Sequence, residues 1–458
     1  MQTSDDAAPQ TEAADPRRWR TLVLLGVAQL MLIVDVTVVA IALPEMQADL
    51  GLERSGVAWV ASSYALVFGG LMLLGGKVAD ILGPRRVVLA GLSLFVAASL
   101  LAGLSGSGEV LVLARVLQGA GAAAMSPAAL SVIVRTFTGA ELTRALGVWS
   151  ALGGAGAAVG VLLGGVLTSG PGWQWVFFIN VPVGIVLMIG LVRSVRPLPG
   201  SGGQVDLAGA ALVTASTGAL VYGLVAAGDA GWLSASTLIA AVTGLIGYAL
   251  FGWRIRTAPA PLIEPGVLRR GPVLRGLVLI FVATALMISV FFLGSFALQH
   301  LHGFTALETG LSFLPVAVGT ILGSTVAGRL LPRWGVRAVS GAGLLIAAAG
   351  LTATAAIFSM TVLIVATSVA ALGIGAAFVA AAGSMFSAVQ PHEAGVASGA
   401  LSTFHEFGAA AGVSAVSSIA AAALLTPRFG AFAPGYWFAA VVALVACLAS
   451  LSPGRKAA

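Results

Sequence analysis

Three charged side chains fall inside long apolar stretches of this chain: Asp35, Arg115 and Glu406. The chain has 23 basic and 17 acidic residues, and the others gather mainly in short polar connections. An ionised side chain deep in hydrocarbon is costly, so each of the three is a candidate functional residue. Two carboxylates that can exchange protons, with an arginine that keeps its charge, are the groups that a proton-coupled carrier requires.

The chemistry expected of each group follows from its surroundings. Burial favours the neutral form of Asp35 and a nearby cation favours the ionised form, so a balanced carboxylate can load and release a proton. Its alternative role is helix packing. Arg115 would tune that balance, with a purely structural ion pair as the alternative. Glu406 is a second proton site or a site for a cationic substrate. His405 titrates near neutrality and is a candidate relay, with a packing histidine as the alternative.

Six further side chains are candidates for a proton relay or for the lining of a drug-sized cavity, with ordinary packing as the alternative: Thr37, Trp59, Tyr64, Gln118, Gln299 and Phe404. Gln118 shares a helix face with Arg115, because residues three apart align. With both carboxylates ionised, the three embedded charges sum to one negative charge. This balance favours cationic or neutral substrates over anions.

The elements that must position these groups are membrane-spanning helices. Hydrophobic residues make up 59% of the chain and charged residues 9%, with a mean hydropathy of +1.03. In soluble domains, apolar residues average about 45–50% and charged residues about 25%. A spanning helix needs roughly 20 apolar residues. Fourteen such stretches predict an all-α polytopic membrane protein, near 21–43, 57–75, 87–105, 110–134, 146–168, 176–192, 207–227, 233–253, 276–299, 309–331, 338–357, 361–386, 399–424 and 434–451.

The basic residues predict the orientation of the chain. With an even number of spans, all of them fall in cytoplasmic connections or tails except Arg54, Arg115 and Arg428. This bias is the positive-inside rule, and it places both termini in the cytoplasm. The positive charge therefore indicates orientation and contact with anionic lipid headgroups, and not nucleic acid. Residues 1–20 are polar and acidic, unlike a cleavable signal peptide. We expect the plasma (inner) membrane of a bacterium.

The sequence repeats itself at an offset of 252 residues. The pattern G-[K/R]-x5-G-x-R occurs at Gly76–Arg85 and again at Gly328–Arg337. The same offset relates Glu141 to Glu393, Gly147 to Gly399, Gly156 to Gly408 and Gly160 to Gly412. Two copies of six spans predict parallel repeats about an axis along the membrane normal, with an inserted two-helix hairpin between them. The expected parts are a tail at 1–20, a six-helix bundle at 21–194, linkers and hairpin at 195–272, a second bundle at 273–452 and a tail at 453–458.

Several motifs resemble those of one transporter family. The segments are Asp35–Pro44, Gly76–Arg86, Arg115–Gly119 (R-x-x-Q-G), Gly156–Gly165 and Trp173–Pro182 (W-Q-W-V-F-F-I-N-V-P). Together they resemble the fourteen-span drug:H⁺ antiporter branch of the major facilitator superfamily, over nearly the whole chain. The chain departs from the branch's motifs in four places, one of which is Ile81 at a usually basic position. Ala40 replaces an asparagine, Val161 replaces the proline of the antiporter motif, and His405-Glu406 stands where many relatives show Arg-Gln.

The resemblance implies roles in gating and helix packing. The loop after the second span implies a cytoplasmic gate, in which Asp80 and nearby arginines latch the outward-facing state: Gly76, Lys77, Asp80, Gly83, Arg85 and Arg86. The glycine-rich fifth span is expected to pack across the two halves and to seal the carrier against leak, through Gly156, Gly160, Gly164 and Gly165. Its repeat partner carries Gly408 and Gly412, and such faces of small residues let helices approach closely.

Other chemistry is not indicated by the sequence. The one Gly-Lys pair, Gly76-Lys77, lacks the other residues of a phosphate-binding loop, so no ATP site is expected. One cysteine and four histidines argue against a metal site, and we expect no cofactor, no nucleic-acid partner and no enzymatic activity. The predicted function is proton-coupled export of amphipathic, antibiotic-like compounds by alternating access. The alternatives are a narrow exporter of an endogenous metabolite or siderophore and, from another class, an ion channel.

Overall fold

A computed structural model describes residues 18–451 except 138, 201, 203, 205, 260, 263–264, 358, 390–393 and 422–429. The regular structure of this part is helical, and it contains no strand. The predicted all-α membrane fold is therefore confirmed. Of the predicted features, residues 1–17 of the first tail, the tail at 453–458, Glu393 and Arg428 lie outside the described residues.

The predicted apolar stretches fall on helices that tertiary packing extends at one or both ends. The first bundle contains α1 (Arg18–Leu50), α2 (Arg54–Leu82), α3 (Pro84–Gly103), α4 (Gly108–Thr136), α5 (Gly139–Ser169), α6 (Trp175–Phe178) and α7 (Asn180–Ser194). The inserted segment contains α8 (Leu207–Ala230), α9 (Ala235–Thr257) and α10 (Pro265–Leu268). The second bundle contains α11 (Gly271–Phe296), the π-helix η1 (Ala297–Leu301), α12 (Ala306–Ser312), α13 (Leu314–Ala356), α14 (Met360–Phe386), α15 (Ala394–Ile419) and α17 (Ala433–Leu451).

In the described part of the chain, 11 helices are long and apolar enough to cross a membrane. Two predicted stretches, 309–331 and 338–357, share the kinked helix α13. The predicted number of fourteen crossings and the predicted domain boundaries remain predictions.

A glycine with positive φ marks the same point of each repeat. Gly83 has φ +93° between α2 and α3, and Gly335 has φ +74° at the kink of α13. Glycine adopts this conformation without the steric cost that a Cβ atom brings. The G-x-R motif thus ends one helix and starts the next at positions 252 residues apart, as the predicted repeat requires.

Glycine contacts between helices follow the same offset. A Cβ atom on Gly91 would lie 2.6 Å from the carbonyl oxygen of Gly121, which brings α3 onto α4. A Cβ atom on Gly343 would lie 2.7 Å from the carbonyl oxygen of Gly373, which brings the second arm of α13 onto α14. Each pair depends on the absence of a side chain, because close backbone approach leaves no room for one.

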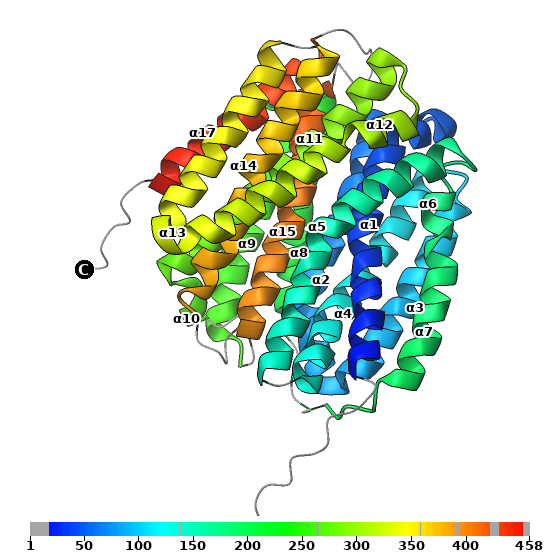
Figure 1. Cartoon of the computed structure of the whole chain (residues 1–458), viewed down its shortest axis with the longest axis vertical. Helices are drawn as coiled ribbons and strands as arrows, with labels where there is room; N and C mark the ends of the chain where they lie inside the picture. The colour runs from blue at the N-terminus through cyan, green and yellow to red at the C-terminus, as the bar shows by residue number, and fades with distance from the viewer. Residues whose placement is uncertain are drawn as a thin grey trace, which may run out of the picture.

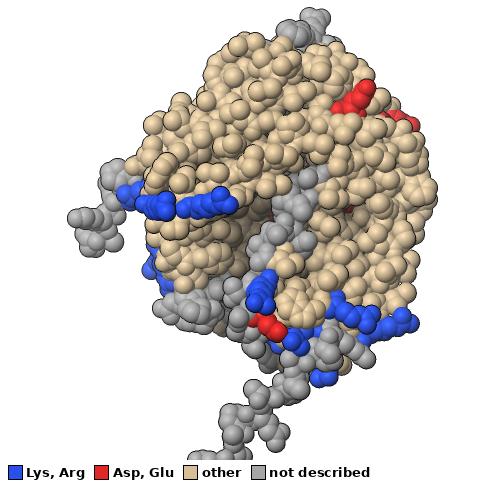
Figure 2. Space-filling model, viewed as in Figure 1, with Lys and Arg blue, Asp and Glu red and all other residues tan. Residues whose placement is uncertain are grey.

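The two bundles meet along two seams, visible in Figure 1. One seam joins α2 to α15, and the other joins α5 to α12 and the start of α13. The basic end, defined as the end with the connections α2–α3, α4–α5 and α7–α8, carries Arg85, Arg135 and Arg193. In the view of Figure 2, Lys and Arg side chains lie at the left and along the lower part, and acidic side chains lie at the upper right and at the lower centre. The placement of the basic end in the cytoplasm stays a prediction.

The inserted hairpin is held to both bundles by Arg54, one of the three basic residues that the predicted orientation leaves out of the cytoplasmic connections. Arg54 starts α2, is only 2% exposed, and pairs with Asp229 of α8 at 2.8 Å. It also donates hydrogen bonds to the carbonyl oxygen of Val225 and, at 3.2 Å, to the Ser417 hydroxyl of α15. Helix α2 begins at this residue, and its side chain turns inward to satisfy these acceptors. At the basic end Asp206 pairs with Arg254 at 2.9 Å and joins α8 to α9.

The repeated glycines predict a graded effect of alanine substitution on stability. Gly83→Ala combines the strain of φ +93° with a Cβ atom only 2.4 Å from the carbonyl oxygen of Leu198. Gly335→Ala meets no atom within 4 Å and brings only the strain of φ +74°. We expect Gly83→Ala to lower the melting temperature of the purified protein more than Gly335→Ala does. Gly328→Ala is the control: this helical glycine also meets nothing within 4 Å, and the change should be neutral or stabilising by up to about 1 kcal/mol. Equal melting temperatures for all three variants would contradict the explanation.

Candidate functional site

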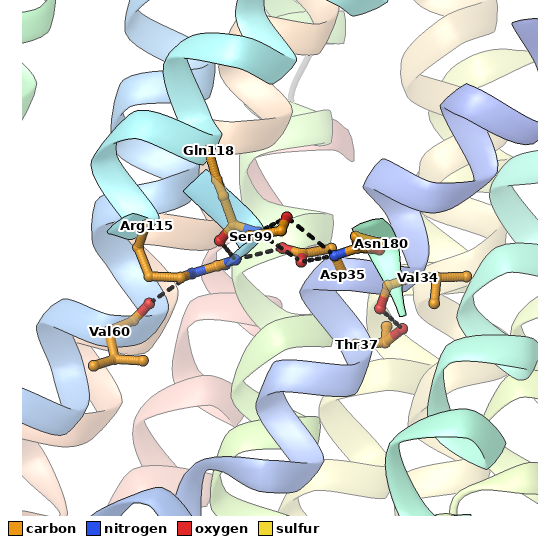
Figure 3. Close-up of polar contacts among 8 residues, drawn as sticks. All are labelled: Val34, Asp35, Thr37, Val60, Ser99, Arg115, Gln118 and Asn180. Carbon is orange, nitrogen blue, oxygen red and sulfur yellow. Dashed lines mark hydrogen bonds and ion pairs between the residues drawn. The ribbon is translucent and has the colours of Figure 1, made fainter. Parts of the chain in front are cut away.

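Five polar side chains from four helices of the first bundle converge in its interior: Asp35, Ser99, Arg115, Gln118 and Asn180. We call them the polar cluster. Each is at most 4% exposed. They come from α1, α3, α4 and α7, and Figure 3 shows them pointing toward one another. The structure thus brings together Asp35, Arg115 and Gln118, although Asp35 and Gln118 are 83 residues apart in the chain.

Both carboxylate oxygens of Asp35 accept hydrogen bonds. Oδ2 accepts from Arg115 in an ion pair, and Oδ1 accepts from Gln118 at 3.3 Å and from Asn180 at 3.2 Å. All three partners are donors, and donors favour the ionised form of a carboxylate. The carboxylate of Asp35 is therefore satisfied on both oxygens within the first bundle.

Arg115 is held on several sides. Its Nε donates to the carbonyl oxygen of Val60 at 3.2 Å, and its Nη1 donates to Gln118 Oε1 at 2.9 Å. Its guanidinium carbon lies 4.3 Å from the centroid of the Tyr64 ring. A cation over an aromatic face gains about 2 kcal/mol or more when desolvated. These contacts hold the guanidinium beside Asp35 and restrict its movement toward another partner.

Two members of the polar cluster were not chosen as site residues from the sequence. Ser99 accepts hydrogen bonds from Gln118 at 2.8 Å and from Asn180 at 3.4 Å, so it orients both amides. Asn180 lies in the W-Q-W-V-F-F-I-N-V-P motif, which was noted only for its resemblance. A polar residue at the start of an apolar helix was the available signal for Asn180, whereas a serine in an apolar stretch is too common to single out Ser99.

Glu406 lies in the second bundle, on the seam between α15 and α2. Its Cβ atom packs where Gly69 of α2 lacks a side chain, 2.7 Å from the position that a Cβ atom would take. His405 Nδ1 is 3.1 Å from Glu406 Oε1, and the side chains are 43% and 9% exposed. The histidine therefore faces open space while the carboxylate is buried. Tyr64 is close enough to Asp35, Arg115 and Glu406 to interact electrostatically with each.

A small cavity lies between the bundles beside Arg115. Its volume of about 20 Å³ suits roughly one water molecule. Arg115 and Tyr64 are its polar lining residues, and the remaining ones are apolar: Val36, Val39, Ala40, Leu43, Ala61, Ala65, Ile288, Phe292, Ala409 and Val413. Among the residues that the structure describes, none forms a hydrogen bond with the hydroxyl of the fully buried Tyr64. Ala40, one of the departures from the family motif, leaves this wall apolar.

The other predicted lining residues lie elsewhere. Thr37 bonds to the carbonyl oxygen of Val34 on its own helix and packs against Gly160 of α5. Gln299 donates to the carbonyl oxygen of Ile41 at 2.9 Å, which ties η1 to α1 near the end opposite the basic end. Trp59 and Phe404 are partly buried and pack against apolar clusters.

The predicted gating residues make contacts inside the first bundle. Asp80 pairs with Arg135 at 3.2 Å, and Arg85 donates to the carbonyl oxygen of Val192 at 2.9 Å. Gly76 and Lys77 are half-buried and Arg86 is exposed. A role of these residues in latching one state of a transport cycle stays a prediction.

The glycine faces pack differently from the expectation. Gly156, Gly160 and Gly164 contact α1, and Gly408 and Gly412 contact α11, so each face closes a helix pair within one bundle. Of these five and Gly165, only Gly165 contacts the other bundle, at Leu307.

The arrangement places an ion pair inside the first bundle and a second carboxylate, Glu406, on the seam with the second bundle. No group of three or more metal-ligating residues occurs in the part of the chain that the structure describes. Arg115 and Tyr64 lie beside the otherwise apolar cavity between the bundles.

Comparisons with known proteins agree with this architecture. The family model of the Major Facilitator Superfamily matches residues 25–413. A puromycin resistance protein of Streptomyces alboniger is 37% identical over 91% of this chain and 85% of its own length. A cephamycin export protein of Amycolatopsis lactamdurans is 35% identical over 87% and 84%. A multidrug resistance protein of Mycobacterium tuberculosis is 31% identical over 88% and 76%.

Solved structures show the same fold at lower identity. A bacterial homologue of the human lysosomal transporter Spinster, in an inward-facing and occupied conformation, has a TM-score of 0.66 at 17% identity and covers 96% of both chains. An auto-inhibited peptide transporter of the POT family has a TM-score of 0.65 at 20% identity, covering 96% of this chain and 99% of its own. The chain belongs to the major facilitator superfamily, within its branch of antibiotic- and drug-resistance exporters.

Proposed function

We propose that this protein exports amphipathic, antibiotic-like small molecules across a bacterial plasma membrane in exchange for protons, with its basic end in the cytoplasm. The observation that carries the proposal is the buried Asp35–Arg115 pair directly beside a cavity between the two bundles. Relatives with resistance and export functions support the direction of transport and the substrate class. The apolar lining of the cavity favours amphipathic compounds over the polar metabolites of the alternative reading.

The exchange uses the two carboxylates and the arginine. Separation of the bundles on the cytoplasmic side admits the substrate beside Arg115 and Tyr64, while Asp35 is ionised within its cluster. After the bundles rock, Asp35 or Glu406 accepts a proton from the outer side as the substrate leaves, and the return releases that proton inside. One charge moved across 100 mV contributes about 2.3 kcal/mol, and each pH unit contributes about 1.4 kcal/mol. One proton per substrate therefore sustains a substantial concentration gradient without ATP.

Reconstitution in liposomes with an internal pH dye tests the proposal. Addition of cationic and neutral amphipathic compounds should move protons with wild type. Asp35→Asn keeps the size of the side chain and removes its charge, so proton movement should fall at least about tenfold, which corresponds to about 1.4 kcal/mol. The variant also leaves Arg115 buried without its anion, a change that costs about 3–5 kcal/mol, so its melting temperature should fall.

Glu53→Gln is the matched control, because Glu53 is exposed and makes no side-chain cap bond at the start of α2. Proton movement that survives both Asp35→Asn and Glu406→Gln would overturn the assignment of these carboxylates to coupling.

Substitutions of Asn180 and Ser99 distinguish a residue that bonds to Asp35 directly from one that acts on it through other side chains. Asn180→Ala removes a donor to Asp35 Oδ1, so the polar cluster loses one direct contact with the carboxylate and the half-maximal pH of transport should shift. Ser99→Ala leaves every donor to Asp35 in place and removes only the acceptor that orients two amides. Its shift should be in the same direction and smaller. A pH profile unchanged in both variants, with normal protein folding, would contradict the role of the polar cluster.

Glu406 should select among substrates by charge. Glu406→Gln removes the negative charge from the α2–α15 seam and keeps the size of the side chain. We expect transport of cationic compounds to fall about tenfold and that of neutral compounds to change little, because one lost charge contact is worth on the order of 1–2 kcal/mol. The measurement is the initial rate for matched cationic and neutral dyes. Equal losses for both, together with lost proton movement, would instead identify Glu406 as the proton carrier.

A further inference from the structure

His405 and Glu406 form a pair on α15 whose two members have different surroundings. The Glu406 carboxylate is buried where α15 packs on Gly69 of α2, whereas the side chain of His405 is 43% exposed. Nδ1 of the imidazole ring lies 3.1 Å from Oε1 of the carboxylate. An ionised carboxylate only accepts hydrogen bonds, so Nδ1 carries the hydrogen of this contact. A further proton on the ring therefore binds at Nε2 and places a full positive charge beside Glu406.

The charges near the cavity between the bundles do not balance. Asp35 and Arg115 compensate each other in their ion pair. Among the residues that the structure describes, the ion-pair partner of Glu406 is the His405 ring alone. The three ionised groups together carry one negative charge while His405 is neutral, and protonation of its ring cancels that charge.

The pair lies about one helical turn from the cavity. Ala409 and Val413 of α15 line the cavity, and they follow Glu406 by three and seven residues, which places all three on one face of the helix. Tyr64, which also lines the cavity, interacts electrostatically with Glu406. A positively charged compound in this region therefore meets Glu406 as its uncompensated anion.

Aromatic rings flank the pair. The Phe378 ring of α14 lies 6.0 Å from the His405 ring. Phe404 precedes the pair and Phe407 follows it, with their rings 6.4 Å apart. The face of an aromatic ring attracts a cation electrostatically. A buried carboxylate among aromatic rings thus offers the chemistry that recognises a lipophilic cation.

Histidine is the residue type here that changes charge between about pH 5 and 8. Helix α15 carries no other charged or titratable side chain than the pair, and it packs against α2, α8, α11, α14 and α17. The charged or titratable side chains of those helices are Arg54, Tyr64, Lys77 and Asp80 on α2, Tyr222 and Asp229 on α8, Arg275 on α11, and Tyr436 and Cys447 on α17, while α14 has none. Arginine, lysine, tyrosine and cysteine ordinarily titrate above about pH 8, and aspartate below about pH 4.

We propose that Glu406 binds lipophilic monovalent cations and that protonation of His405 displaces them. This inference rests on the proposed export function and names its charged substrates. While the ring is neutral, the carboxylate attracts the cation. With a proton on Nε2, the imidazolium pairs with the carboxylate and repels the cation, so one proton replaces one cation. Neutral compounds do not compete with this proton.

Equilibrium binding to the purified full-length protein tests the proposal. Tetraphenylphosphonium is the cationic probe, because its charge is the same at every pH, and Nile red is the neutral probe. Between about pH 8 and about pH 5, where histidine changes its charge, wild type should lose affinity for tetraphenylphosphonium. We expect a loss of at least about fivefold, which corresponds to roughly 1 kcal/mol. The affinity for Nile red should stay nearly constant.

Two substitutions of His405 should act in opposite directions. His405→Gln cannot take up a proton, so this variant should keep the high affinity of wild type over the whole pH range. His405→Lys keeps a positive charge beside Glu406, so its affinity for tetraphenylphosphonium should be low at both ends of the range. His300→Gln changes an exposed histidine of η1 and is the control. It should show the pH dependence of wild type.

The outcomes separate this inference from the function on which it rests. The same pH dependence in wild type and in His405→Gln would overturn the role of His405. Failure of wild type to bind tetraphenylphosphonium, or binding that Glu406→Gln leaves unchanged, would overturn the cation site. Either result leaves export of neutral compounds in liposomes standing. Absence of proton movement by wild type with every compound would instead refute the proposed function.

Discussion

The ion pair between Asp35 and Arg115 is the interaction on which the interior of the first bundle depends. Two ionised groups in a low-dielectric interior are stable only when nearly every donor and acceptor is satisfied. That requirement explains the rest of the polar cluster. Gln118 and Asn180 donate hydrogen bonds to the Asp35 carboxylate. Ser99 accepts a hydrogen bond from the Gln118 amide, and the Val60 carbonyl oxygen accepts one from the Arg115 guanidinium. Four helices must therefore keep their relative positions for the pair to persist.

The cluster lies within one bundle, whereas the cavity and Glu406 lie between the two. Rocking of the bundles can change the surroundings of Tyr64 and of the cavity side of Arg115 without separating Asp35 from its donors. Glu406 is in the opposite position, because its neighbour Gly69 belongs to the other bundle. The surroundings of Glu406 depend on the relative position of the bundles, whereas those of Asp35 do not. The two carboxylates can therefore act at different steps of one transport cycle.

The scaffold is repeated, but its chemistry is not. Gly83 and Gly335 share a positive φ, and Gly91 and Gly343 make equivalent contacts 252 residues apart. At the same offset, Asp35 corresponds to Met287 and Arg115 to Thr367. The inserted hairpin adds a second asymmetry, because α8 packs on both helices of the α2–α15 seam. The two halves thus share equivalent glycine contacts, whereas the buried charges and the contacts of the inserted hairpin are not repeated.

The sequence by itself determined the helical class, the apolar stretches, the repeat and three of the buried charges, Asp35, Arg115 and Glu406, because hydrophobic runs, charge asymmetry and motif glycines are local signals. It also identified Asp35, Arg115 and Gln118 as candidates. Only the tertiary structure decided that Ser99 and Asn180 complete their cluster, that Arg54 turns inward, that Thr37 faces α5, and that the glycine faces close helix pairs within each bundle. These outcomes depend on which side each helix presents to its neighbours, and that choice is made by the packing of residues far apart in the chain.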